Sequence, residues 1–149
     1  MNDRYFTVEE VNALVPQLAA SMNLVLQLHV HLRATCRALV EQGVRVTPDG
    51  LARGERIEAV GSARLRLAHA RGIHDAVREA MREIEALGGQ IKDVERGLVD
   101  FPSWLDGRHE VLLCWRIGEH TVDWYHDTEA GFSSRRPIVG RSFSSERRE

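Results

Sequence analysis

The residues of this chain that could carry chemistry gather in one stretch, from Gly97 to Pro137. It holds all three tryptophans, Cys114 and a run of aspartate, glutamate and histidine side chains. Carboxylate, thiolate and imidazole groups are the ligands with which proteins bind zinc. The composition therefore indicates either a site or a small sheet that needs large side chains for its core.

Candidate site residues can be named within this stretch. Asp100 and His126 are the first choice for holding a small ligand or a divalent metal ion, and Glu110 and Glu129 are further candidate metal ligands. No pair among these four has the spacing of a known metal motif. The candidates for binding a small ligand are Asp100, His126, Arg108, Arg135, Arg136, Trp115 and Trp124.

Two helices are expected before the sheet that carries these residues. Thr7-Val8-Glu9-Glu10 is a capping box, which predicts a helix that begins at Thr7 and runs to about Gln42. Apolar residues in steps of three and four predict a second helix from about Ser62 to Leu87. Together they form an antiparallel hairpin over residues 7–88, joined by a Gly-rich, charged loop.

The first helix has more apolar surface than a single partner helix would cover. Its heptad-like stripe is widened by extra apolar residues, namely Leu14, Leu24, Leu26, Leu28 and Val30. The sheet or a second copy of the hairpin would cover the remainder. We therefore expect a homo-oligomer that forms through helix 7–42.

Turn signals divide the rest of the chain into three strands. Asp106-Gly107 and Gly118-Glu119-His120 separate strand-like runs at about 91–101, 109–117 and 121–127. The fold class that follows is α+β, a long antiparallel helical hairpin followed by a small three-stranded antiparallel sheet over residues 90–137.

The register of these strands decides which side chains meet. If both turns have two-residue loops, Leu113 lies between Asp100 on the first strand and His126 on the third, and Trp115 faces Trp124. All five then share the face that packs against the helices. Since strands lie about 4.8 Å apart, Asp100 and His126 begin about 10 Å apart and would touch only by leaning together.

Asp100 and His126 allow two interpretations. In the first, they lie at the edge of the core and are satisfied by backbone groups or by arginines such as Arg135 and Arg136. In the second, they line a pocket between sheet and helices, with Glu110, Glu129 or Cys114 nearby. Cys114 itself is expected to be a buried strand residue opposite Tyr125.

Composition and charge limit the class of protein. The chain has 149 residues and a net charge of −2, which gives no case for nucleic-acid or membrane binding. His29, His31 and Arg33 interrupt its longest apolar run, the start lacks the features of a signal peptide, and the two cysteines lie far apart. We expect a cytoplasmic protein with one domain over residues 1–137 and a flexible polar tail over 138–149.

Several strings of the sequence resemble one protein family. YFTVEEVNALVPQL, IKDVERGLVDFPSWLDGRHEVLLCWRIGE, DWYH and the GF..RRP stretch are similar to the bacterial domain of unknown function 2203 family. The resemblance implies a small standalone protein of helices followed by a short sheet, and it implies no activity. It draws attention, without assigning roles, to Asp100, Arg108, Cys114, Trp115, His126, Gly131, Phe132, Arg135 and Arg136.

The sequence is compatible with two functions. The first is a non-enzymatic oligomeric interaction or scaffold module, which follows from the wide apolar stripe of the first helix. The alternative is a metal- or small-ligand-binding protein, with or without enzymatic activity, whose site surrounds Asp100 and His126. The sequence does not decide whether the chain is an enzyme.

Overall fold

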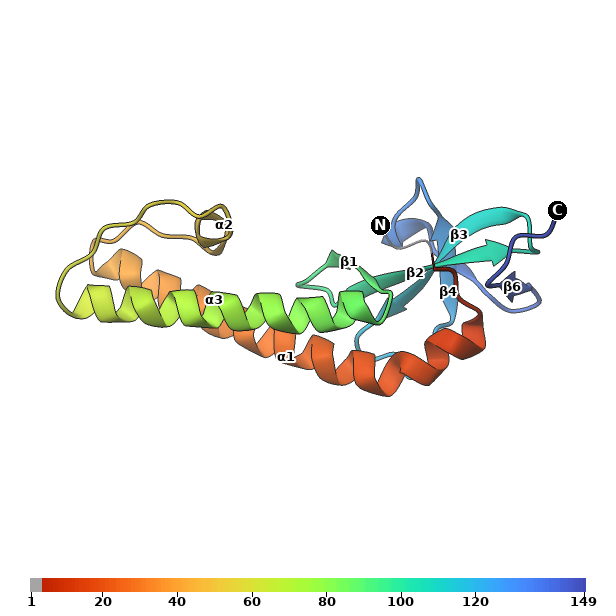
Figure 1. Cartoon of the computed structure of the whole chain (residues 1–149), viewed down its shortest axis with the longest axis horizontal. Helices are drawn as coiled ribbons and strands as arrows, with labels where there is room; N and C mark the ends of the chain where they lie inside the picture. The colour runs from red at the N-terminus through yellow and green to blue at the C-terminus, as the bar shows by residue number, and fades with distance from the viewer. Residues whose placement is uncertain (1–3) are drawn as a thin grey trace. The chain divides into compact units, whose positions relative to one another are not determined.

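The computed structural model describes residues 4–149 and confirms the α+β class (Figure 1). Three α-helices come first: α1 (Val8–Glu41), α2 (Pro48–Ala52) and α3 (Ser62–Ala86). Within the described residues six strands follow, with the short 3-10 helix η1 (Phe132–Ser134) between the fourth and the fifth. They are β1 (Gln90–Asp93), β2 (Leu98–Leu105), β3 (His109–Arg116), β4 (Trp124–Asp127), β5 (Arg136–Pro137) and β6 (Phe143–Ser144).

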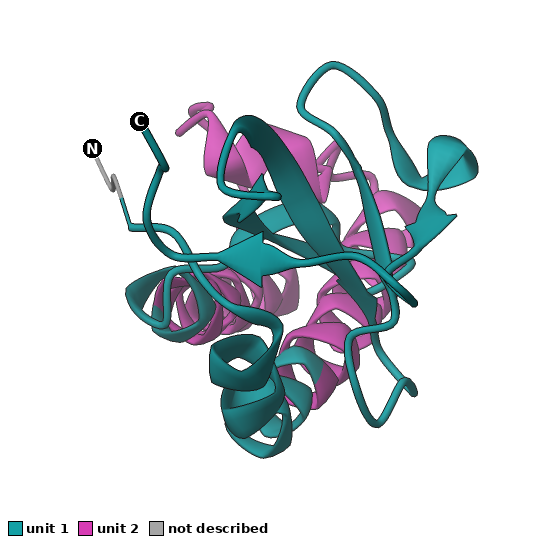
Figure 2. Cartoon of the chain, turned by 90° about the vertical axis from the view of Figure 1, so that its right-hand side faces the viewer, with its two compact units in different colours: residues 1–22, 83–149 teal, residues 23–82 magenta. Residues whose placement is uncertain are grey.

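The strands form one antiparallel sheet in the order β1-β2-β3-β4-β5, and β6 pairs with β2. The chain divides into two compact units, which Figure 2 draws in different colours. The first contains the start of the chain up to Met22 and Glu83–Glu149, and the second contains Asn23–Arg82. The expectation of a single domain over residues 1–137 stays a prediction.

The capping box predicted at Thr7 is present. The backbone N–H of Glu10 donates to Thr7 Oγ1 at 3.1 Å, and the backbone N–H of Thr7 donates to Glu10 Oε1 at 3.0 Å. From Val8 the helix continues without a break through Pro16. The expected start of the first helix is confirmed because this signal depends only on neighbouring residues.

The second unit is an antiparallel pair of helices with a structured connection. The rings of His31 and His69 lie 5.3 Å apart, and Gln42 Nε2 donates to Ser62 Oγ at 3.0 Å. The connecting loop contains α2, whose first N–H groups are capped by the Thr47 hydroxyl at 2.9 Å from Gly50 N.

Much of the apolar surface of α1 is uncovered within this single chain. Its most apolar 18-residue window has a mean hydropathy high enough for a membrane span, yet 28% of that window is buried. Core helices of proteins in water pass the same test of length and composition. A membrane span is therefore not excluded by the polar residues His29, His31 and Arg33 alone. The absence of membrane binding stays a prediction.

Both predicted strand registers are wrong by one residue. Asp100 pairs with Cys114 and not with Leu113, while His126 pairs with Leu112. The loop between β2 and β3 has three residues, 106–108, in which both Asp106 (φ 55°) and Gly107 (φ 72°) are left-handed. An odd loop shifts every pairing by one position.

The connection between β3 and β4 is also longer than the two residues expected. It runs over residues 117–123, because two contacts hold it away from a tight hairpin. Trp115 Nε1 donates to the carbonyl oxygen of Glu119 at 2.9 Å, and the N–H of Val122 donates to Asn12 Oδ1 at 2.7 Å.

The corrected register gives the sheet two different faces. We call one the helix-side face: Val99, Phe101, Val111, Leu113, Trp115 and Tyr125. The ring of Phe6, just before α1, meets Phe101 edge to face at 5.1 Å. We call the opposite one the site face: Asp100, Leu112, Cys114, Trp124 and His126.

The C-terminal residues differ from the flexible polar tail expected over 138–149. Phe143 and Ser144 form β6 and pair with Leu105 and Trp104 of β2. The ring of Phe143 is buried and lies 5.2 Å from that of Tyr125. Hydrogen bonds add to this contact, because the N–H of Asp106 donates to the carbonyl oxygen of Ser142 at 2.8 Å and Arg141 donates to the Tyr125 hydroxyl at 3.1 Å.

Candidate metal centre

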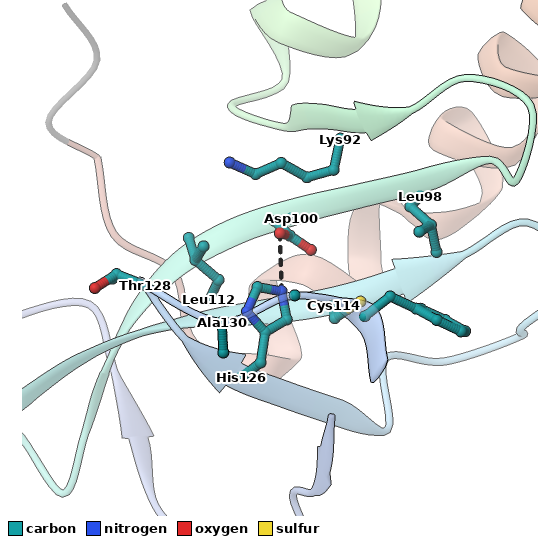
Figure 3. Close-up of a pocket in the computed structure, with 10 residues that line it drawn as sticks. Lys92, Leu98, Asp100, Leu112, Cys114, His126, Thr128 and Ala130 are labelled. Carbon is teal, nitrogen blue, oxygen red and sulfur yellow. Dashed lines mark hydrogen bonds and ion pairs between the residues drawn. The ribbon is translucent and has the colours of Figure 1, made fainter. Parts of the chain in front are cut away.

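Three adjacent strands bring a carboxylate, a thiol and an imidazole together on the site face. Asp100 comes from β2, Cys114 from β3 and His126 from β4, as Figure 3 shows. Their potential ligand atoms all lie within 4.8 Å of one another, and all three residues are buried. The exposed fraction is 1% for Asp100, 1% for Cys114 and 3% for His126.

The two ring nitrogens of His126 have different partners. Nδ1 lies 2.8 Å from the backbone carbonyl oxygen of Asp127, and Nε2 lies 2.9 Å from Asp100 Oδ2. A carbonyl oxygen can only accept, so Nδ1 carries a proton. A carboxylate also only accepts, so Nε2 needs a second proton for this contact, which makes the ring an imidazolium.

The surroundings favour the charged form of His126 strongly. The hydrogen bond to Asp100 is the main cause, a hydrogen bond with Cys114 adds to it, and together they raise the pKa of His126 from 6.5 to about 10. Burial acts in the opposite direction but is the weaker effect. In the protein without a metal ion, a proton therefore occupies the space between imidazole and carboxylate.

One oxygen of the group has no partner. Oδ1 of Asp100 is buried and forms no hydrogen bond with any described residue. Buried carboxylate oxygens are almost always hydrogen-bonded or bound to a cation, because leaving one unpaired costs about 1 to 3 kcal/mol or more. A buried carboxylate oxygen without a hydrogen bond, beside a thiol and an imidazole, offers a position at which a cation could bind.

A small cavity of about 120 Å³ adjoins the three side chains. The residues after β4, from Thr128 to Phe132, form one of its walls, and Lys92 forms part of another. The sequence analysis expected a pocket between sheet and helices. The cavity instead opens on the opposite face, because the one-residue shift turns Cys114 and not Leu113 toward Asp100.

The two glutamates named as further metal ligands lie elsewhere. Glu110 is exposed near the start of β3 and accepts a hydrogen bond from the Tyr5 hydroxyl. Glu129 is exposed in the turn that follows β4. Neither belongs to the group formed by Asp100, Cys114 and His126.

The other candidate ligand-binding residues are spread over the first unit. Arg135 pairs with Glu119 at 3.3 Å and lies 4.1 Å from the ring of Phe132, at the edge of the cavity wall. Trp124 is half-buried on the site face and Trp115 is fully buried on the helix-side face. Two arginines are exposed away from the group: Arg108 in the β2–β3 turn and Arg136 in β5.

One residue at this centre was named from the sequence only as a possible neighbour of the site, and another was not named at all. Cys114 was expected opposite Tyr125 as a structural residue, whereas it pairs with Asp100 on one side and Trp124 on the other. Lys92 lines the cavity, and the only signal for it was that the chain contains no other lysine. Both depend on pairing details that no local pattern encodes.

A family model described as "Uncharacterized conserved protein (DUF2203)" matches residues 4–138. The chain belongs to this family. The resemblance seen in the sequence is thereby confirmed, and the DUF2203 match covers both the helices and the residues of the candidate metal centre. No curated protein and no solved structure matches the chain. The site must therefore be interpreted from its own geometry.

Proposed function

We propose that this DUF2203 protein binds a zinc ion through Asp100, Cys114 and His126. One observation carries the proposal: three different zinc-ligating groups converge, all buried, and one carboxylate oxygen among them has no partner. Three protein ligands with a fourth position left to water or a small molecule are typical of zinc sites that bind or transform a ligand. The adjoining cavity supplies that fourth position.

The distances support this assignment. Zinc bonds of about 2.0 to 2.3 Å place tetrahedral ligand atoms about 3 to 4 Å from one another. The potential ligand atoms here lie within 4.8 Å, so an inward movement of about 1 Å would close the coordination shell. Side-chain rotation is sufficient for a change of this size.

The hydrogen bond from His126 Nδ1 to the carbonyl of Asp127 also favours metal binding. Histidine ligands commonly donate their second ring N–H to a carbonyl or carboxylate, which orients the ring and leaves the other nitrogen for the metal. In this protein Nε2 is the nitrogen directed at Asp100.

The same contacts argue against a cysteine nucleophile. In a catalytic triad, one ring nitrogen of histidine takes the proton of the nucleophile while the other binds the carboxylate. Here Asp127 O holds one nitrogen of His126 and Asp100 holds the other. Because both ring nitrogens already carry a proton that is donated to an oxygen, neither can act as the base for Cys114, and the geometry supports shared coordination over proton relay.

Zinc loading of purified protein tests the proposal. After removal of metal with a chelator, the wild-type chain should retain about one zinc ion upon dialysis against zinc, by elemental analysis. Cys114→Ser should weaken zinc binding by more than about 100-fold, beyond the loss typical of outer-shell residues. Cys36→Ser, which changes the other buried cysteine, should bind zinc as the wild type does.

Glu110→Gln is a second control, because Glu110 lies outside the group. A wild-type chain that retains no zinc would overturn the proposal. So would a Cys114→Ser variant that is folded by circular dichroism and binds zinc as tightly as wild type.

The uncovered apolar surface of α1 supports a second and separate proposal, self-association. Val30 and Val40 are 66% and 55% exposed on one side of the helix, where the half-buried Leu26 and the exposed Arg33 and Arg37 also lie. Exposed apolar residues at such spacing are typical of a helix that packs against a partner. We take the partner to be a second copy of this chain.

Light scattering at micromolar concentration tests this proposal. The wild-type chain should have the mass of an oligomer, and Val30→Glu with Val40→Glu should reduce it to that of a monomer, because the two substitutions replace the exposed apolar side chains of this surface by charges that are costly to bury. Val139→Glu places the same change at an exposed valine outside α1 and should leave the mass unaltered. A wild-type monomer would refute self-association.

A further inference from the structure

The only lysine of the chain lies at the cavity of the proposed zinc centre. A bulge in β1 puts it there: Ile91 pairs with Val99 and Asp93 with Leu98, so Lys92 is the extra residue between two paired ones. Bulges redirect side chains and are common beside binding sites. Figure 3 shows Lys92 extending from β1 alongside Asp100, on the side of β2 away from His126.

The Lys92 ammonium is exposed and forms no ion pair within residues 4–149. The neighbouring arginines differ in this respect, because Arg96 pairs with Asp93 at 3.7 Å and Arg135 with Glu119 at 3.3 Å. Among the described residues that line the cavity, Lys92 is the only lysine or arginine, and no ion pair balances its charge.

The charges at the cavity indicate what net charge a ligand would need once zinc is bound. Zinc carries two positive charges, which the carboxylate of Asp100 and the thiolate of Cys114 balance when His126 is neutral. The ammonium of Lys92 then leaves one positive charge at the cavity. That balance fits a ligand with a single negative charge better than a phosphate dianion.

The walls and the volume define the rest of the ligand. Leu98, Leu112, Ala130 and Phe132 provide apolar side chains. A cavity of about 120 Å³ holds the equivalent of about four waters, at about 30 Å³ of liquid volume each. This is room for a short organic molecule with an apolar body.

We propose that the cavity binds a small monocarboxylate, whose carboxylate bridges the zinc ion and Lys92 while its apolar body lies against Leu112 and Phe132. This inference rests on the proposed zinc site and names the class of its ligand. The carboxylate would fill the fourth zinc position and the apolar chain would replace water from the cavity.

Cobalt-loaded protein tests the ligand separately from the metal. Cobalt(II) can replace zinc in tetrahedral sites and gives absorption bands that zinc does not. A sulfur-to-cobalt charge-transfer band would show that Cys114 binds the metal. A change in the visible bands would show that a ligand has entered the fourth position. Butyrate should change the visible bands and bind more tightly than acetate. Butylammonium, with a similar apolar chain and the opposite charge, should cause no change.

Lys92→Gln should weaken butyrate binding about tenfold, the size expected for one charge-assisted hydrogen bond. Arg78→Gln removes the same charge from α3 and should bind butyrate as wild type does. If no charge-transfer band appears, the zinc proposal itself fails. The monocarboxylate assignment fails, while the metal site stands, if the charge-transfer band appears and any one of three results is found. Butyrate leaves the spectrum unchanged, it binds equally well to wild type and Lys92→Gln, or it binds less tightly than inorganic phosphate.

Discussion

His126→Leu should lower the free energy of unfolding of the metal-free protein by about 3 to 5 kcal/mol. The variant removes the partner of Asp100, whose carboxylate is 1% exposed and already has one oxygen without a hydrogen bond. A buried charge that loses its counterion keeps the full cost of leaving water. Urea denaturation in the presence of a chelator measures the loss.

A second substitution should then restore stability. Asp100→Ala combined with His126→Leu removes both charges and leaves apolar groups in an apolar setting, which is often neutral relative to the ion pair. We therefore expect the double variant to be more stable than His126→Leu alone. His120→Leu, at an exposed histidine of the β3–β4 connection, should cost little. If the two losses at Asp100 and His126 simply add, the side chains are not coupled and the ion pair described above is wrong.

The helix ends could be predicted from the sequence, because their signals involve only residues that are neighbours in the chain. The helix that begins after Thr7 follows from a capping box within four residues. The end of α3 follows from Gly88, which adopts a left-handed φ of 101° against the ring of Phe6. These signals are local, so no knowledge of tertiary contacts was needed.

The candidate site was predicted only in part, because Asp100 and His126 were assigned to the helix-side face together with Leu113, whereas they lie on the site face together with Cys114. Each of the two turns contains an odd number of residues where an even one was assumed. The two errors cancel between β2 and β4, so Asp100 and His126 do share a face, as expected. They do not cancel for β3, which is why Cys114 joins the group in place of Leu113.

The remaining features of the site depend on contacts between distant segments. The β3–β4 connection is held open by Asn12, more than a hundred residues earlier in the chain. The β1 bulge that places Lys92 and the turn from Thr128 to Phe132 that covers the cavity carry no strong local pattern either. A single sequence gives hydrophobic pattern and turn type, but not these long-range hydrogen bonds.

The metal-free protein should lose stability as the pH rises from 6.5 to about 10, by an amount on the order of 5 kcal/mol. The pKa of His126 is 6.5 in the unfolded chain and about 10 in the folded protein. Below 6.5 both states are protonated and the imidazolium–carboxylate pair contributes fully. Between the two values the folded state binds the extra proton, so raising the pH favours unfolding. Denaturation at a series of pH values across this window, with a chelator present, measures the loss.

Zinc should remove this pH dependence, because the metal takes the place that the proton holds between Asp100 and His126. A site that must release a proton to bind metal gains affinity as the pH rises. The stabilisation by zinc should therefore grow over the same window in which the metal-free protein weakens, and the two denaturation series should separate. His126→Leu should show neither the pH-dependent loss nor the zinc effect. If zinc-loaded and metal-free wild type weaken in parallel, zinc does not bind at His126; if the loss persists in His126→Leu, another group causes it.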